Sequence, residues 1–138
     1  MHKILQTAVQ TKPFAQLQRE LKQKGNTVYL NELVGGALSF YLAAAVAKTA
    51  GLHIVVAEDR DQAAYVMNDL YALLDEKRVL FFPSAYKRSI LYGQEEAQSV
   101  VMRTNAMNAV QSLTDSEDLV LCTYPEALAE RVAAAAQI

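Results

Sequence analysis

An α/β fold, with a mostly parallel sheet at the centre of a three-layer sandwich, is predicted by three features of the sequence. Four short apolar runs are rich in Val, Ile, Leu and Phe without strict alternation, which is typical of parallel strands buried on both faces. Longer helical patterns separate these runs, so right-handed crossovers would place helices on both faces of the sheet. The chain has 138 residues, 52% of them apolar, which suits one compact domain.

Residues 1–26 are predicted to form a helical extension ahead of the sheet. The pattern over 13–24 is that of an amphipathic helix, which Gly25 would close. This helix would lean on the edge or end of the sheet, and residues 27–138 would form the α/β domain itself. The residues of the 13–24 helix that we expect to pack against the rest of the protein are Phe14, Leu17 and Leu21.

The α/β domain is predicted to alternate strands with helices. A helix over 36–50 is apolar nearly all round, so we expect it to be deeply covered. Gly51 follows it, where a left-handed stop conformation suits glycine. The four predicted strands cover residues 28–30, 53–57, 79–82 and 119–123.

Three further helices are predicted from capping residues and apolar spacing. The first starts at Asp59 or Asp61, both good cap residues, and presents an apolar stripe to the sheet. The second covers 95–113 and carries two carboxylates at its favourable amino end. The third begins at Pro125, which suits a first helical turn, and extends to Ala136.

Charge is unevenly distributed along the chain. The formal net charge is −2 and the sequence pI is near 5.7, so the molecule as a whole has no electrostatic attraction to nucleic acid. Residues 1–26, in contrast, hold five cations and one carboxylate, a net charge of +4, which leaves −6 on the rest. A solvated helix face is the ordinary interpretation of this basic segment. Contact with nucleic acid or with an acidic partner is the alternative.

Cysteine content and hydropathy indicate a soluble, cytoplasmic protein. Cys122 is the only cysteine and lies in an apolar run, so we expect a buried thiol and no disulfide within the chain. No stretch approaches the roughly 18 consecutive apolar residues of a membrane helix. We therefore expect no membrane partner.

The loop after the first predicted strand is where such a fold would bind phosphate. This loop meets the amino end of a helix, whose free N–H groups and dipole attract anions. A working P-loop has spaced glycines that let its backbone wrap the phosphates, then a Lys for the terminal phosphates and a Ser or Thr for magnesium. On that pattern, Glu32 and Ala37 replace the glycines, Leu38 replaces the lysine, and Ser39 alone survives.

These replacements predict a degenerate P-loop NTPase-like domain without a nucleotide site. Glu32 would repel a phosphate, and Leu38 supplies no compensating charge. A tight turn into a buried helix is reason enough for Gly35 and Gly36. No later predicted strand ends in the acidic residue that helps to hold magnesium. We expect no catalytic group, no metal and no cofactor in this chain.

Other chemically capable side chains form no recognisable constellation. His2 and His53 are the only histidines, and neither has neighbours at metal-ligand spacing. Glu58 and Asp59 follow the second predicted strand, where capping of the next helix is the expected role. The candidate nucleophiles lack an elbow motif; they are Ser39, Ser84, Ser89 and Cys122.

The segment 84–93 is the most suggestive loop of the sequence. It combines Tyr86 and Tyr92 with the adjacent cations Lys87 and Arg88. Such a mixture can stack on bases and hold phosphates. The ordinary alternative is a surface loop whose tyrosines fold back on the protein.

Several short segments, taken in order, carry a family resemblance over most of residues 27–134. They are the Glu-Leu-Val-Gly run at 32–35, the Val-Val-Ala-Glu-Asp strand end at 55–59 with Ala63, the Phe-Phe-Pro run at 81–83, a helix containing Arg103, and the strand at 118–123. In this order they resemble the amino-terminal region of bacterial transcription-repair coupling factors, which is similar to the first domain of the excinuclease B subunit. The loop after residue 83 departs from the acidic, aromatic and Pro-Tyr-Asp pattern of that family.

The resemblance implies that the chain is a fragment of a larger protein. Whole members of the family are DNA translocases, whose motor uses ATP and magnesium. They displace stalled RNA polymerase and recruit the excinuclease A subunit through an insert domain. Their amino-terminal module is a degenerate copy that has lost its nucleotide site, so the resemblance implies a noncatalytic scaffold.

Three functional hypotheses follow from these observations. We expect a noncatalytic interaction and scaffold module of a coupling factor, acting through protein contacts. One alternative is a stand-alone nucleotide binder that uses the loop at 35–39. The other is a DNA-binding module that uses the basic amino-terminal helix and the loop at 86–88.

Overall fold

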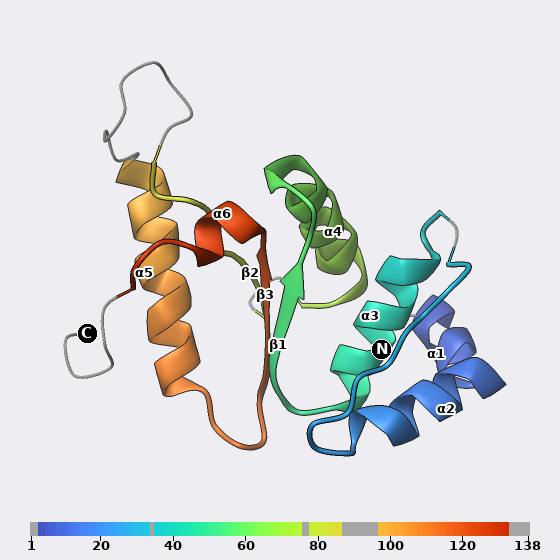
Figure 1. Ribbon diagram of the computed structural model, residues 1–138. Helices are drawn as coiled ribbons and strands as arrows, with labels where there is room; N and C mark the ends of the chain where they lie inside the picture. The colour runs from blue at the N-terminus through green and yellow to red at the C-terminus, as the bar shows by residue number, and fades with distance from the viewer. Residues whose placement is uncertain (1–2, 34, 76–77, 87–96, 133–138) are drawn as a thin grey trace.

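The computed structural model describes residues 3–33, 35–75, 78–86 and 97–132, and their central element is a parallel sheet (Figure 1). The strands are β1 (Gly51–Val56), β2 (Val79–Phe81) and β3 (Asp118–Thr123), and they lie in the order β1-β3-β2. The central strand is β3, whose Val120 lies opposite His53 on one side and Val79 on the other. The α/β class and the parallel sheet are therefore confirmed.

Helices cover both faces of this sheet. From β1 the chain crosses over β3 to β2 through α4 (Arg60–Leu73), and from β2 it returns to β3 through α5 (Ala97–Ser112). Because crossovers between parallel strands keep one hand, reversing the direction of travel moves the helix to the opposite face. Figure 1 shows the sheet nearly edge-on, with α5 on one side and α4 on the other.

The first predicted strand is wrong, because residues 28–30 belong to no strand. This segment lies apart from the sheet, on the α3 side of the molecule (Figure 1). Its central side chain, Tyr29, is 84% exposed, whereas the equally short β2 buries Val79 and Phe81. Three residues provide few ladder hydrogen bonds, so they form a strand only where side-chain burial compensates for the entropy of ordering them.

Two amino-terminal helices form an outer layer beyond α3 (Ala37–Lys48), where one was predicted. They are α1 (Lys3–Val9) and α2 (Lys12–Leu21), and both contact α3 on its side away from the sheet (Figure 1). Phe14 and Leu17 are buried as predicted, but Leu21 is 46% exposed at the end of α2, so its packing role is wrong. Phe14 belongs to the same apolar core as the sheet.

Local capping accounts for where α4 begins, whereas α3 ends earlier than predicted. The Asp59 side chain accepts a hydrogen bond of 2.8 Å from the backbone N–H of Gln62, so this aspartate caps α4 as predicted. The helix α3 is shorter than predicted and ends at Lys48. Gly51 has a φ of +118° and opens β1 rather than closing α3 directly.

The last helix, α6, ends much earlier than predicted. It covers Pro125–Leu128, whereas the pattern predicted continuation to residue 136; residues 133–136 lie outside the described part of the chain. Glu130, two residues beyond the end of α6, makes a long-range contact there: its carboxylate accepts a hydrogen bond of 2.9 Å from the backbone N–H of Ala85, in the loop after β2. The described part of α5 begins at Ala97, so Glu95 and Glu96 lie outside it.

Candidate functional site

The loop predicted to bind phosphate does not sit at the edge of the sheet, because no strand precedes it. Glu32 and Gly35 both have a left-handed backbone, with φ of +63° and +61°, and a turn at Gly35 and Gly36 leads into α3. Gly36 then occupies the cap position of α3 without a side-chain cap. The carboxylate-bearing Glu32 is exposed beside this turn, while Val34 lies outside the described residues.

Ser39, the one side chain here that matches the P-loop pattern, is already engaged. The Ser39 hydroxyl is buried and donates a hydrogen bond of 2.8 Å to the Asp69 carboxylate of α4. A hydroxyl held in this way ties α3 to α4 and does not face an open loop. Ala37 is half-buried, and Leu38, at the position of the P-loop lysine, is an exposed hydrocarbon.

The carboxyl edge of the sheet, where parallel α/β proteins usually bind ligands, is closed by its own hydrogen bonds. The Thr123 hydroxyl donates to the Phe82 carbonyl at 2.8 Å, which joins the ends of β3 and β2. The backbone N–H of Ser84 donates to the Tyr124 hydroxyl at 2.8 Å. The Ser84 hydroxyl in turn donates to the Glu130 carboxylate, which also accepts from the backbone N–H of Ala85, so this hydroxyl forms part of the packing of the edge.

A buried arginine completes this edge, and sequence analysis assigned it no role. Arg103 of α5 donates from Nη1 to the Pro83 carbonyl at 2.8 Å and to the Ala127 carbonyl at 3.0 Å. Its guanidinium lies 4.1 Å from the Phe82 ring centre and 3.4 Å from a Glu130 carboxylate oxygen. Arg103 is the only charged residue in α5, which is the signal that could have identified it.

The remaining candidates for chemistry are structural. Nε2 of His53 lies 2.8 Å from the carbonyl of Thr49, four residues earlier in the sequence. Burial in the central strand raises the pKa of the Cys122 thiol to about 12, so the nucleophilic thiolate is scarce at neutral pH. Within the described ranges, no group of three His, Cys, Asp or Glu side chains is placed to hold a metal ion. His2 and Ser89 lie outside these ranges.

The predicted interaction loop is only partly described. Tyr86 follows β2 and is exposed, as a stacking residue would have to be. Lys87, Arg88 and Tyr92 lie outside the described residues. The proposal that this loop touches nucleic acid therefore stays a prediction.

An apolar groove lies on the α5 side of β1, and the sequence did not predict it. Leu52, Ile54 and Val56 alternate along β1, so they share one face, and all three are exposed. The helix α5 contacts β2 and β3 and leaves this face of β1 open. The groove measures about 270 Å³ and is lined by Leu52, Ile54, Phe82, Met107, Val110, Leu121, Thr123, Leu128, Glu130 and Val132.

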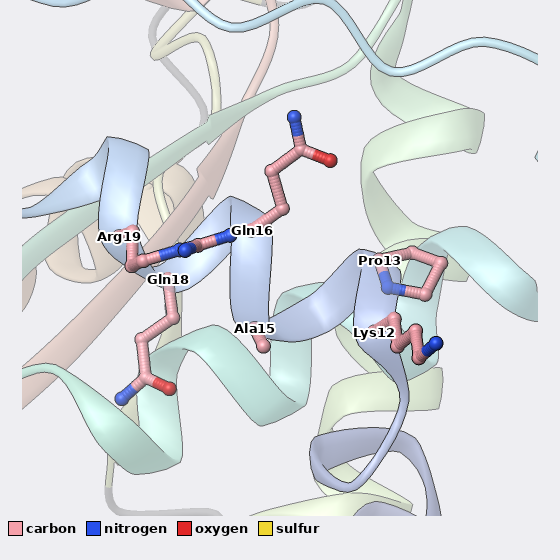
Figure 2. A pocket seen from close by; sticks show the side chains of 6 residues that line it. All are labelled: Lys12, Pro13, Ala15, Gln16, Gln18 and Arg19. Carbon is pink, nitrogen blue, oxygen red and sulfur yellow. The ribbon is translucent and has the colours of Figure 1, made fainter.

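A second depression, of about 650 Å³, lies along α2 (Figure 2). Its lining residues are Lys12, Pro13, Ala15, Gln16, Gln18 and Arg19. All come from one helix, and their side chains spread apart along it instead of converging on one point (Figure 2). This shape suits an extended partner lying across the helix better than a small molecule enclosed in a pocket.

Comparison of the chain with models of known protein families, with curated protein sequences and with solved structures finds no significant match in any of the three. No helix in the described part of the chain is both long and apolar enough to cross a membrane.

Proposed function

We propose that this chain is a noncatalytic scaffold and interaction module, of the kind found at the amino terminus of transcription-repair coupling factors. The observation that carries the proposal is the hydrogen bond from Ser39 to Asp69. It occupies the one polar side chain retained from the phosphate-binding pattern and places a carboxylate next to it. With Glu32 exposed in the same loop, a triphosphate would meet two acids and no cation among these side chains.

The open apolar face of β1 supports a role in protein contacts. Parallel sheets are normally covered by helices on both faces, and exposed contiguous apolar surface usually marks an interaction site. The uncovered position lies beside α5, over the edge strand, where the next helix of a larger doubly wound sheet would pack. We infer that a helix from another part of the full-length protein covers Leu52 and Ile54.

The family resemblance supplies the wider part of the proposal. ATP and magnesium would act in a motor elsewhere in the full-length protein. The excinuclease A subunit, RNA polymerase and DNA would contact other domains, and this module would make intramolecular contacts in the cytoplasm. These assignments rest on the segments at 32–35, 55–59, 81–83 and 118–123 together with Arg103.

Titration calorimetry with ATP and magnesium tests the noncatalytic proposal. We expect no saturable heat at submillimolar nucleotide for the wild-type chain or for Ser39→Ala. The variant should lose about 1 kcal/mol of unfolding free energy, because the Asp69 carboxylate loses its hydrogen-bond donor. Saturable ATP binding that weakens in Ser39→Ala would overturn the proposal in favour of an unusual phosphate loop.

The accessibility of the groove is tested with a dye that fluoresces on apolar surfaces. We expect Ile54→Lys to reduce dye fluorescence by half or more, because Ile54 lines the groove and is 53% exposed. Val101→Lys is the matched control, since Val101 is 57% exposed on α5 but does not line the groove. The free energy of unfolding of both variants should lie within about 0.5 kcal/mol of the wild-type value. Equal dye loss in the two variants would contradict an accessible groove.

A further inference from the structure

We propose that the basic outward face of α2, together with Tyr29, binds single-stranded nucleic acid. In this mode the cations contact phosphates and the tyrosine ring stacks on a base. The inference goes beyond the proposed function, which concerns protein contacts, and rests on other residues. It assigns a partner to the amino-terminal segment, for which the sequence alone left a solvated face as the ordinary interpretation.

The helix α2 separates its apolar and basic residues onto opposite faces. Phe14 and Leu17 are buried beneath the helix. Lys12 and Arg19 are exposed and seven residues apart, so they lie on the same side, about 10 Å apart along the axis. Gln16 lies between them and also lines the depression along the helix (Figure 2). The outward face of α2 therefore presents two cations flanking an amide, a set of donors suited to phosphate oxygens.

The cations of this segment are not neutralised by neighbours. Lys3, Lys12, Arg19, Lys22 and Lys24 are all exposed. Among the described residues, none of them forms an ion pair with a carboxylate. The only acid of the segment, Glu20, accepts a hydrogen bond of 2.5 Å from the Asn26 side chain. A net charge of +4 within 1–26 thus remains on a protein whose total is −2, which makes the positive field local.

An unusually exposed aromatic residue follows the basic helix. Tyr29 is 84% exposed, higher than any other large apolar or aromatic side chain in the described part of the chain. Tyr29 lies in the segment 28–30, which forms no strand, and its ring does not pack into the core. Lys24 is five residues away, which places the two within about 18 Å of each other along the chain. A strand of several nucleotides can span that distance.

The combination favours nucleic acid over an acidic protein. Centres of protein interfaces usually hold large apolar or aromatic anchors that exclude water. The depression along α2 has no such anchor: four of its six lining residues are polar or charged, and their aliphatic stems, with Pro13 and Ala15, supply its apolar surface. Exposed aromatics interspersed with cations are typical of single-strand binding, because the bases of a single strand are free to stack. In a duplex the bases are already stacked, so Tyr29 would gain no partner.

Fluorescence anisotropy of the full 138-residue chain with a labelled 20-nucleotide oligodeoxythymidine tests the proposal. We expect Lys12→Gln combined with Arg19→Gln to weaken binding at least tenfold at low salt. The slope of log affinity against log salt should fall in magnitude by about 1.4, since each lost phosphate contact on a single strand removes about 0.7. Lys48→Gln combined with Arg131→Gln removes the same charge from exposed sites elsewhere and should change the affinity less than twofold.

Tyr29→Ser tests the stacking contact separately. We expect at least a fivefold loss of affinity with an unchanged salt slope, because stacking displaces no counterions. Tyr65→Ser is the matched control, since Tyr65 is 66% exposed on α4, and it should bind like the wild type. Circular dichroism would establish that each variant is folded.

Three outcomes would overturn the proposal. One is equal weakening by the two charge-removal pairs, which would mean nonspecific attraction to the whole surface. Another is duplex DNA binding as tightly as the single strand, with no effect of Tyr29→Ser. The third is no oligonucleotide binding together with salt-sensitive binding of polyglutamate, which would identify an acidic protein as the partner. None of these results bears on ATP binding, so the proposed function stands or falls separately.

Discussion

Replacing Arg103 with alanine is expected to lower the free energy of unfolding by about 3 to 5 kcal/mol, the cost typical of breaking a buried ion pair from one side. The side chain is buried and donates to the carbonyls of Pro83 and Ala127 at 2.8 and 3.0 Å. Its loss would also leave the largely buried Glu130 carboxylate without its cation. Urea unfolding followed by circular dichroism measures the effect.

Arg131→Ala is the matched control for this prediction. Arg131 is exposed and directly follows Glu130, so its removal should change the unfolding free energy by no more than about 0.5 kcal/mol. A double-mutant cycle of Arg103→Ala with Glu130→Gln should show coupling of about 1 to 3 kcal/mol. A loss below about 1 kcal/mol for Arg103→Ala would mean that the carboxyl edge of the sheet holds without this residue.

Phe14→Ala is expected to cost a similar amount, about 3 to 5 kcal/mol, because it empties a fully buried aromatic site. The Phe14 side chain is 0% exposed and its ring stacks with Tyr41 of α3 at a centroid distance of 6.3 Å. Leu5 of α1 is equally buried in the same core. Unfolding should therefore stay a single transition, shifted to lower urea concentration, when followed by circular dichroism and tyrosine fluorescence.

Leu21→Ala distinguishes specific packing from general loss of apolar surface on α2. Leu21 is 46% exposed, so we expect a cost of about 0.5 kcal/mol or less. A separate early transition in Phe14→Ala would indicate that α1 and α2 unfold independently of the sheet. Equal losses for Phe14→Ala and Leu21→Ala would contradict the burial that separates these residues.

Elements with strong local signals were predictable from the sequence. The runs that became β1, β2 and β3 are apolar and β-branched, and α4 has a capping aspartate, Asp59, immediately before its apolar stripe. These signals depend on only a few neighbouring residues, so they can be recognised in the sequence without knowledge of the tertiary structure. The run at 28–30 is also apolar, but none of its side chains is fully buried, and composition alone could not separate the two cases.

The candidate site was only partly predictable for the same reason. The substitutions Glu32 and Leu38 are visible in the sequence, and they oppose phosphate binding wherever the loop lies. The hydrogen bond from Ser39 to Asp69 joins residues thirty positions apart on two helices, and no local sequence pattern predicts it. The contacts of Arg103 with the loop after β2 and with α6 are equally long-range.

By itself, the sequence determined the α/β class, the apolar runs that form β1, β2 and β3, and the presence of Glu32, Ala37 and Leu38 where a P-loop has two glycines and a lysine. Only the tertiary structure decided which apolar runs pair with a neighbouring strand, where α6 ends, and which faces of α2 and β1 are exposed to solvent. The physical reason is that a run of residues sets its own backbone preference. Burial, and the partner of each polar group, depend on segments that are distant in sequence and meet only in the folded chain.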